Sequence, residues 1–220
     1  MKKTSLLPYE LEILLGGLLG DSHIRKDNNI IQFGHSDKQI EYLNWKHDKL
    51  SRISTEVWKI ITKDNYIRYN FQTIQEYKND MKSIKLLICD KEGNKKLSRK
   101  WLNLLSPLSL AIWWMDDGCL SIHKGNRYGK LCTHNFSYEE NLIIQNYFKV
   151  VWDIKVDIKK EKDKYYFCRF NVENLKKLIF LIYPYVLEIP SMLYKINLNY
   201  KNSVDLGYFK EVYDVIINKI

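Results

Sequence analysis

Two stretches of the chain are almost continuously apolar and end in an acidic residue. The first runs from Leu11 to Asp21 and reads LEILLGGLLGD, and the second runs from Leu108 to Asp117 and reads LSLAIWWMDD. A proline precedes each stretch, at Pro8 and at Pro107, and proline suits the first turn of a helix. The pattern predicts two helices, each with an acidic residue in its last turn.

The segments that follow these two helices also correspond to each other. Each half continues with a hairpin, an amphipathic helix, a pair of strands in which polar and apolar residues alternate, and a third helix. The hairpins are expected to turn near residues 27–29 and 125–126, where Asp, Asn and Gly tolerate turn conformations. The remaining predicted helices cover residues 37–54, 75–89, 138–152 and 173–186, and the strands cover 57–62, 67–72, 154–159 and 168–171.

This order predicts an α+β fold built from a diverged duplication of one αββαββα unit. The equivalent acids Asp21 and Asp117 lie 96 residues apart. A polar and basic stretch, DKEGNKKLSRK at residues 90–100, separates the halves. We expect an N-terminal half at 1–92, a linker at 93–106 and a C-terminal half at 107–220.

The net charge of +9 favours a polyanionic partner, although a coding bias toward Lys, Asn and Ile would give a similarly basic surface. The four cysteines form no C-x-x-C pair, which favours a reduced, intracellular protein. Glu10 and Glu12 interrupt the apolar N-terminus, and no apolar run reaches 18 residues. We therefore expect no membrane partner.

The two apolar segments carry a recognisable motif. LLGGLLGD at residues 14–21 and LAIWWMDDG at residues 110–118 resemble the signature helices of the LAGLIDADG homing endonucleases of the single-chain, two-motif type. LSPLSLAIWWMDDG and IPSMLYKINL also resemble segments of that family, and the likeness covers nearly the whole chain. It implies an intron-encoded monomer with a saddle of antiparallel sheets around a central two-helix interface. The implied activity is a staggered double-strand break with 3′ overhangs in DNA, with one acid per motif and one strand cut per acid.

The motif also has a physical interpretation. Gly16 and Gly20 lie four residues apart, so a partner helix can approach to backbone contact distance. A carboxylate at a helix C-terminus faces partial negative charge, which costs about 0.3 to 1 kcal/mol. Bringing Asp21 and Asp117 together would add to this repulsion unless a divalent cation binds between them. Hard oxygen ligands favour Mg²⁺ over zinc.

The family resemblance assigns further roles residue by residue. The metals would take the carboxylates of Asp21 and Asp117 and the backbone carbonyls of Gly20 and Asp116, with Mn²⁺ able to replace Mg²⁺. Lys195, in MLYKINL, and Lys96, in the linker, match basic residues near the family's active sites. Their expected role is electrostatic, or to orient water.

Polar residues on the predicted strands are the candidates for contact with DNA, because a two-stranded ribbon fits the major groove. Since the halves differ in sequence, the site should be long and non-palindromic. The candidates are Arg25, Gln32, His35, Lys59, Arg68, Asn70 and Gln72 in the first half, and His134, Lys155, Lys159, Arg169 and Asn171 in the second.

Other interpretations remain open at this point. The helices could be an ordinary buried pair whose acids are solvated, and the polar strand faces could simply face water. An intron RNA-binding maturase of the same fold, or a DNA-binding regulator without catalysis, would share the basic surface. Organelle, bacterial and phage origins fit the composition equally.

Overall fold

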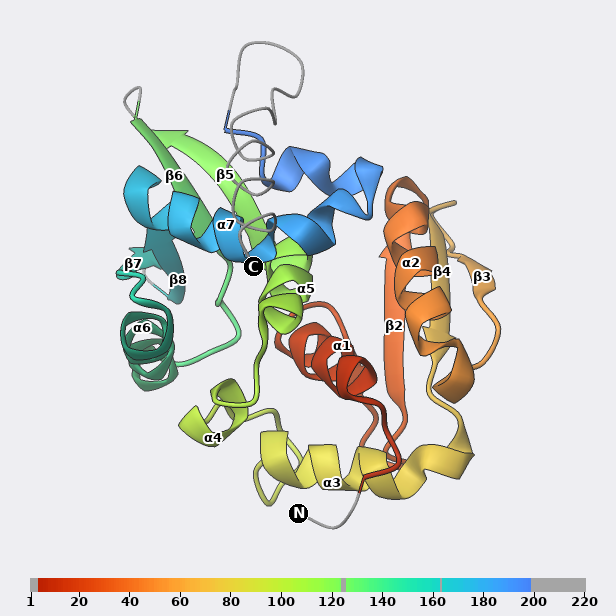
Figure 1. Ribbon diagram of the computed structural model, residues 1–220. Coiled ribbons are helices and arrows are strands. Elements are labelled where there is room, and N and C mark those ends of the chain that lie inside the picture. Colours follow the sequence, from red (N-terminus) through yellow and green to blue (C-terminus); the bar gives the residue numbers. More distant parts are fainter. Residues whose placement is uncertain (1–3, 124–125, 163, 199–220) are drawn as a thin grey trace, which may run out of the picture. The chain divides into compact units, whose positions relative to one another are not determined.

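The computed structural model describes residues 4–123, 126–162 and 164–198, and it divides into two compact units, Met1–Asp116 and Asp117–Ile220. Each unit contains one four-stranded antiparallel sheet covered by helices (Figure 1). The strand orders are β1-β2-β4-β3 and β5-β6-β8-β7, so the same topology occurs twice. The predicted α+β duplication is confirmed.

In the first unit, an apolar helix and a sheet form the core. Its elements are α1 (Pro8–Leu19), β1 (His23–Ile24), β2 (Ile31–Ser36), η1 (Asp37–Gln39), α2 (Ile40–Leu50), η2 (Ser51–Ile53), β3 (Trp58–Ile61), β4 (Ile67–Gln72), η3 (Gln75–Tyr77), α3 (Lys78–Ile88), α4 (Arg99–Leu102) and α5 (Pro107–Asp117). Helix α2 lies against β2 and β4 (Figure 1). Phe33 and Phe71 stack between these strands with ring centroids 4.7 Å apart, and both are buried.

Helix α1 begins where the sequence predicts and is buried along most of its length. Pro8 occupies its first turn, and the Glu10 carboxylate accepts a 2.7 Å hydrogen bond from the backbone N–H of Leu7. Arg52 pairs with the buried Glu10 carboxylate. The helix ends at Leu19, so Asp21 lies just beyond the last turn rather than within it.

Helices α1 and α5 pack at backbone contact distance. An ideal Cβ on Gly16 would lie 2.5 Å from the carbonyl oxygen of Ser109, and one on Gly20 would lie 2.5 Å from the Cβ of Asp116. Any larger residue at either position would force the helices apart. The predicted two-helix interface is therefore confirmed, and Ser109 adds a 2.9 Å hydrogen bond from its hydroxyl to the carbonyl oxygen of Glu12.

The second unit repeats the plan. Its elements are β5 (Gly118–His123), β6 (Asn126–Leu131), α6 (Tyr138–Trp152), β7 (Asp157–Glu161), β8 (Tyr165–Phe170), α7 (Val172–Leu187) and η4 (Pro190–Lys195). Ser137 and Glu140 form a capping box at the start of α6, and Asp153 ends this helix in the left-handed conformation. The boundaries of α6 match the prediction.

Several boundaries differ from the prediction because local hydrogen bonds compete with the strand pattern. Strand β7 begins at Asp157, and Lys155 precedes it with its backbone N–H bonded to Asn174. The side chain of Asn171 caps α7 instead of extending β8. Helix α4 forms inside the predicted linker, where Ser98 caps it. The predicted turn residue Gly125 lies outside the described residues.

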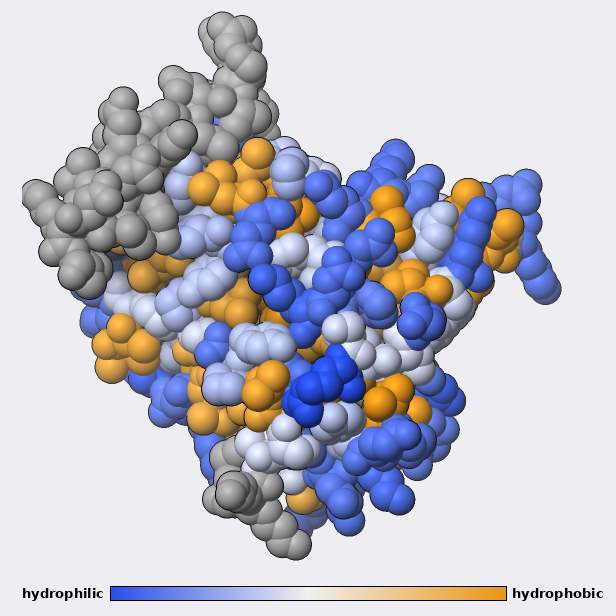
Figure 2. All heavy atoms as spheres, turned by 45° about the vertical axis from the view of Figure 1, so that its right-hand side comes forward, coloured by the Kyte–Doolittle hydropathy of each residue, from blue (hydrophilic) through white to orange (hydrophobic). Residues whose placement is uncertain are grey.

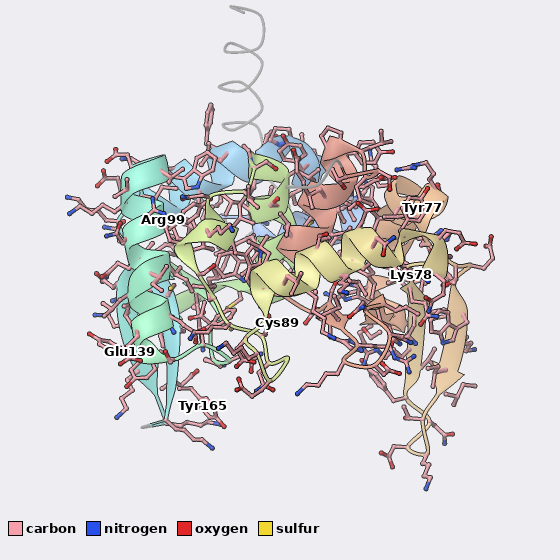
Figure 3. All side chains as sticks on the ribbon, turned by 90° about the horizontal axis from the view of Figure 1, so that it is seen from below. Tyr77, Lys78, Cys89, Arg99, Glu139 and Tyr165 are labelled. Carbon is pink, nitrogen blue, oxygen red and sulfur yellow. The ribbon has the colours of Figure 1, made fainter. Side chains whose placement is uncertain are left out.

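The helices near the linker are short or strongly amphipathic. Helix α3 follows Tyr77 and ends before Cys89 (Figure 3), and it buries Met81, Ile84 and Ile88.

In the face shown in Figure 2, hydrophilic residues predominate and apolar residues form small groups. Among the described residues, no helix has the length and apolarity needed to cross a bilayer.

Candidate active site

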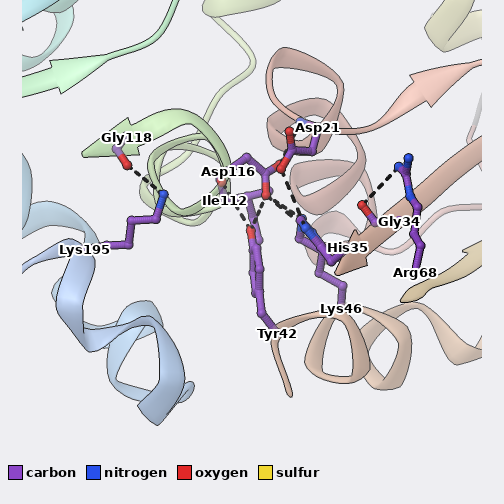
Figure 4. Close-up of polar contacts among 10 residues, drawn as sticks. All are labelled: Asp21, Gly34, His35, Tyr42, Lys46, Arg68, Ile112, Asp116, Gly118 and Lys195. Atoms are coloured by element: carbon purple, nitrogen blue, oxygen red, sulfur yellow. Dashed lines mark hydrogen bonds and ion pairs between the residues drawn. The ribbon is translucent and has the colours of Figure 1, made fainter. Parts of the chain in front are cut away.

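The first motif ends in an exposed carboxylate. Asp21 follows α1 in a turn, and its side chain is 45% exposed. Its backbone N–H donates to Oδ2 of Asp116 over 3.2 Å, which links the end of α1 to the end of α5 (Figure 4). The turn itself is closed by a 2.9 Å bond from the Ser22 N–H to the carbonyl oxygen of Gly17. This close pairing explains why glycine precedes Asp21.

The Asp116 carboxylate is buried and paired. Its side chain is 0% exposed, and Oδ1 accepts hydrogen bonds from Lys46 Nζ at 2.7 Å and from the Tyr42 hydroxyl at 2.9 Å. Tyr42 and Lys46 lie one turn apart on α2, so both reach the same oxygen (Figure 4). The family resemblance assigns Asp116 only a backbone carbonyl role, and the contacts of its carboxylate emerge from the structure. The available signal was a lysine on the apolar face of α2.

His35 completes the cluster. Its side chain is 3% exposed, Nε2 lies 3.0 Å from Lys46 Nζ, and Nδ1 lies 3.7 Å from Oδ2 of Asp21. Burial, followed by the positive charge of Lys46, lowers the pKa of His35 to about 3. The imidazole is therefore neutral near pH 7. The expectation that His35 contacts DNA is not supported, because the ring lies on the helix-covered face of β2.

Asp21, His35 and Asp116 form a group whose potential ligand atoms lie within 4.8 Å of one another. Both oxygens of Asp116 already accept hydrogen bonds, and Lys46 places a positive charge beside it. The positive charge of Lys46 would repel a metal ion at the centre of this group. The carboxylate of Asp21, in contrast, is open to solvent and suits a hard cation such as Mg²⁺.

The second motif ends with a different set of contacts. Asp117 is half-buried, and its carbonyl oxygen accepts a 3.0 Å bond from the N–H of Cys132. The next carbonyl, that of Gly118, accepts a 2.7 Å bond from Nζ of Lys195 (Figure 4). Lys195 ends η4 and is 8% exposed. Lys195 therefore contacts the residue that follows Asp117, the second motif acid.

The structure places Lys95, not Lys96, at the corresponding position in the first unit. Nζ of Lys95 donates to the carbonyl oxygen of Leu18 at 2.6 Å and to that of Ser22 at 3.3 Å. Ser22 follows Asp21 as Gly118 follows Asp117, so both lysines contact the carbonyl after a motif acid. Lys96 is exposed, and its backbone N–H bonds to Ile88. The isolated bridge between Cys89 and Lys95 sets this register.

On the first sheet, strand register separates the candidate DNA contacts. Gln32 pairs with Gln72, and Arg68 lies on the same face of the sheet, away from the stacked phenylalanines. Lys59 pairs with Tyr69, so Lys59 points to the opposite face from Arg68. Lys59 is exposed on that other face, and its contact with DNA stays a prediction.

Two more first-unit candidates have local partners. Asn70 lies on the same face as Arg68 but is only 1% exposed, and its contact with DNA stays a prediction. Gly34 leaves room for the side chains of Asn70 and Arg68, because a Cβ there would clash with both. Arg25 is exposed in the β1–β2 loop and pairs with Asp27 at 3.3 Å.

On the second sheet, Lys159 and Arg169 share one face. Lys159 pairs with Phe167, two residues before Arg169 on β8. The Arg169 guanidinium lies 4.7 Å from the ring centroid of Tyr128. Lys130 belongs to the same face because it pairs with Arg169, and the sequence argument missed it.

The remaining second-unit candidates leave this face. His134 lies in a turn beyond β6, where Nε2 is 3.0 Å from Glu161, so placing it on the hairpin strand was wrong. Lys155 precedes β7, and Asn171 caps α7, so neither extends the polar row. The prediction that both residues lie on strands is therefore wrong.

The family follows from a match over most of the chain. Residues 11–178 match the model of the LAGLIDADG DNA endonuclease family. The chain therefore belongs to this family.

Similar proteins include two curated relatives. A protein RecA of Mycolicibacterium flavescens is 28% identical over 209 residues, covering 87% of this chain and 47% of the relative. The cytochrome b mRNA maturase bI2 of Saccharomyces cerevisiae is 30% identical over 203 residues, covering 84% of this chain and 47% of the relative. The chain thus spans about half the length of each.

A solved structure supports the fold. The homing endonuclease I-WcaI, bound to its DNA recognition sequence, matches with a TM-score of 0.75 and 23% sequence identity, over 90% of each chain. At this identity the likeness shows the fold alone.

Proposed function

We propose that this chain is a homing endonuclease that makes a Mg²⁺-dependent, staggered double-strand break in a long, non-palindromic DNA site. The observation that carries the proposal is the repeated arrangement at the motif ends. In both units an acid follows or ends a signature helix, and a lysine donates to the next carbonyl. A structural pair of helices would not need this arrangement twice.

Asp21 and Asp117 are the proposed metal ligands, one from each motif, with the carbonyls of Gly20 and Asp116 as further donors. A bound Mg²⁺, or Mn²⁺ in its place, would supply Lewis acidity for phosphodiester hydrolysis. The carboxylates would hold the cation and offset its charge, and each acid would serve the cutting of one strand. Lys195 and Lys95 keep positive charge beside the motif ends, where the scissile phosphates would lie. Lys96 stays a weaker candidate.

The polar faces of the two sheets are the proposed DNA contacts. In the first unit they are Gln32, Arg68 and Gln72, with Arg25 in the adjoining loop, and in the second they are Lys130, Lys159 and Arg169. Side chains of these types donate to guanine and adenine edges or to phosphates. Because the two rows differ, they favour an asymmetric target bound by a monomer, with halves at 1–92 and 107–220 joined by 93–106.

The second candidate function is intron RNA binding by a maturase. The specific observation in its favour is the 30% identity to the yeast cytochrome b mRNA maturase. That likeness also fits an organelle origin, with bacterial and phage origins as the other possibilities. A DNA-binding regulator that lacks catalysis is disfavoured because both acids and both lysines are present.

The test uses the full chain and the sequence that flanks its gene. Duplexes carrying the uninterrupted host junction are incubated with protein and Mg²⁺, beside scrambled duplexes and the transcribed intron. We expect cutting of the junction duplex alone, and loss of cutting with retained binding in Asp21→Asn and Asp117→Asn. Tight binding of the intron RNA without cutting of any duplex would instead support the maturase.

A further inference from the structure

Lys46 is a buried cation whose position the proposed metal chemistry does not explain. Its side chain is 0% exposed, yet it carries an ammonium group into the polar cluster of unit 1. Nζ donates to Oδ1 of Asp116 at 2.7 Å, lies 3.0 Å from Nε2 of His35, and sits 4.0 Å from the ring centroid of Tyr42. Each direction of the ammonium therefore has a partner.

The donor inventory fixes the proton on His35. An ammonium has three donors and no acceptor, and that of Lys46 pairs with the Asp116 carboxylate. Nε2 of His35 must therefore accept from Lys46, which leaves the ring proton on Nδ1. This is the opposite of the tautomer that histidine favours in water.

The protonated nitrogen faces the motif acid. Nδ1 lies 3.7 Å from Oδ2 of Asp21, about 0.5–1 Å beyond a hydrogen bond. The Asp21 side chain is 45% exposed, whereas the side chain of His35 is buried at 3% exposure. The same histidine in the other tautomer would present a lone pair to the carboxylate and repel it.

We propose that Lys46 and His35 are positioning residues of the first active site. Lys46 holds His35 in the Nδ1–H tautomer, and that N–H orients the Asp21 carboxylate. Lys46 also serves as the resident cation between His35 and Asp116, so the Asp21 carboxylate is the one side chain of this group that would bind the catalytic metal. The catalytic consequence rests on the proposed function, whereas the tautomer of His35 does not depend on catalysis.

The tautomer of His35 can be tested on the metal-free protein. Two-bond ¹H–¹⁵N correlation spectra distinguish the two neutral tautomers, and the His35→Gln variant identifies the His35 signals by their loss. We expect one protonated nitrogen, Nδ1, and an unprotonated Nε2. A protonated Nε2, or signals averaged between both tautomers, would overturn the proposal whether or not the protein cuts DNA.

The catalytic consequence is tested with isosteric variants of His35. The amide of asparagine reaches the position of Nδ1, whereas that of glutamine reaches the position of Nε2. His35→Asn should therefore retain more cutting of the strand assigned to Asp21 than His35→Gln does, with roughly a tenfold loss for Gln. Equal losses, or a larger loss for Asn, would contradict the assigned orientation.

Lys46 itself is compared with a neighbour on the same helix. Lys46→Met should slow cutting of the strand assigned to Asp21 by roughly tenfold and leave the other strand within about twofold. Lys49→Met, at an exposed position one turn from Trp45, is the control. Equal slowing of both strands at a temperature where circular dichroism shows a folded chain would mean that Lys46 is only structural. The affinity for DNA measured without metal should be the same in all variants. If Lys46→Met does not fold, the comparison of His35→Asn with His35→Gln decides the question.

Discussion

The same type of backbone contact occurs at each motif end, but the side chains near the two ends differ. Lys95 and Lys195 each donate to the carbonyl that follows a motif acid. Strand register aligns His23 with Cys119 and Gln32 with Lys130, which puts Thr133 where His35 stands. The first unit thus buries the Lys46–Asp116 ion pair beside this position, whereas Thr133 lies among neutral side chains.

The neutral cluster of the second unit is satisfied without any ion. Thr133 donates to Oδ1 of Asn141 at 2.5 Å, and the Asn141 amide donates to the carbonyls of Phe136 and Ser137. Cys168 packs against the same asparagine. After duplication, contacts to backbone atoms persist because they do not depend on side-chain identity, whereas side-chain networks can be rebuilt. This difference can be tested in three ways.

The largest expected effect is on stability. Lys46→Met should destabilise the protein by about 3–5 kcal/mol, because it leaves the Asp116 carboxylate buried without its cation. Asn141→Ala, at the neutral cluster, should cost about 1–3 kcal/mol. Urea unfolding monitored by circular dichroism measures both. Adding Asp116→Asn to Lys46→Met should recover part of the loss, and no recovery would show that the pair is not coupled.

The next effect is on cleavage and compares the two lysines. Lys195→Met should lower the cutting rate about 10–100-fold, because a buried ammonium is removed from the second motif end. Lys95→Met should lower it by only a few-fold, since that residue is exposed. Lys96→Met should have a smaller effect than Lys95→Met, and Lys91→Met is the exposed control. A reversed order of Lys95 and Lys96 would restore the assignment made from the sequence.

The smallest effect is on the pH dependence of stability. The unfolded chain protonates His35 near pH 6.5, but the folded chain does so only at about pH 3. The unfolded state therefore binds more protons below pH 6.5, and stability falls as the pH drops through that range. His35 should account for about 1.4 kcal/mol of loss between pH 7.5 and 5.5. Unfolding in EDTA should show this extra slope in the wild type and not in His35→Gln.

The sequence predicted the duplication, the element order and the close helix pair, because apolar periodicity and the glycine spacing are local signals. The roles of both motif acids and of Lys195 came from the family resemblance, and they stay predictions. The sequence missed the cluster of Lys46, Asp116 and His35, since three separate elements bring these residues together. It also left open which face of the sheet Lys59 occupies, because alternation alone does not tell which row of a strand faces the helices.

The central claim is that each motif acid serves one DNA strand, and strand-resolved cleavage tests it most directly. A duplex labelled at both 5′ ends is cut by the wild type, by Asp21→Asn and by Asp117→Asn under the same Mg²⁺ concentration. We predict that the wild type cuts both strands and that each variant leaves a nick, with the two variants nicking opposite strands. If both variants nicked the same strand, or if either still cut both strands at the wild-type rate, the assignment of the two acids would be contradicted.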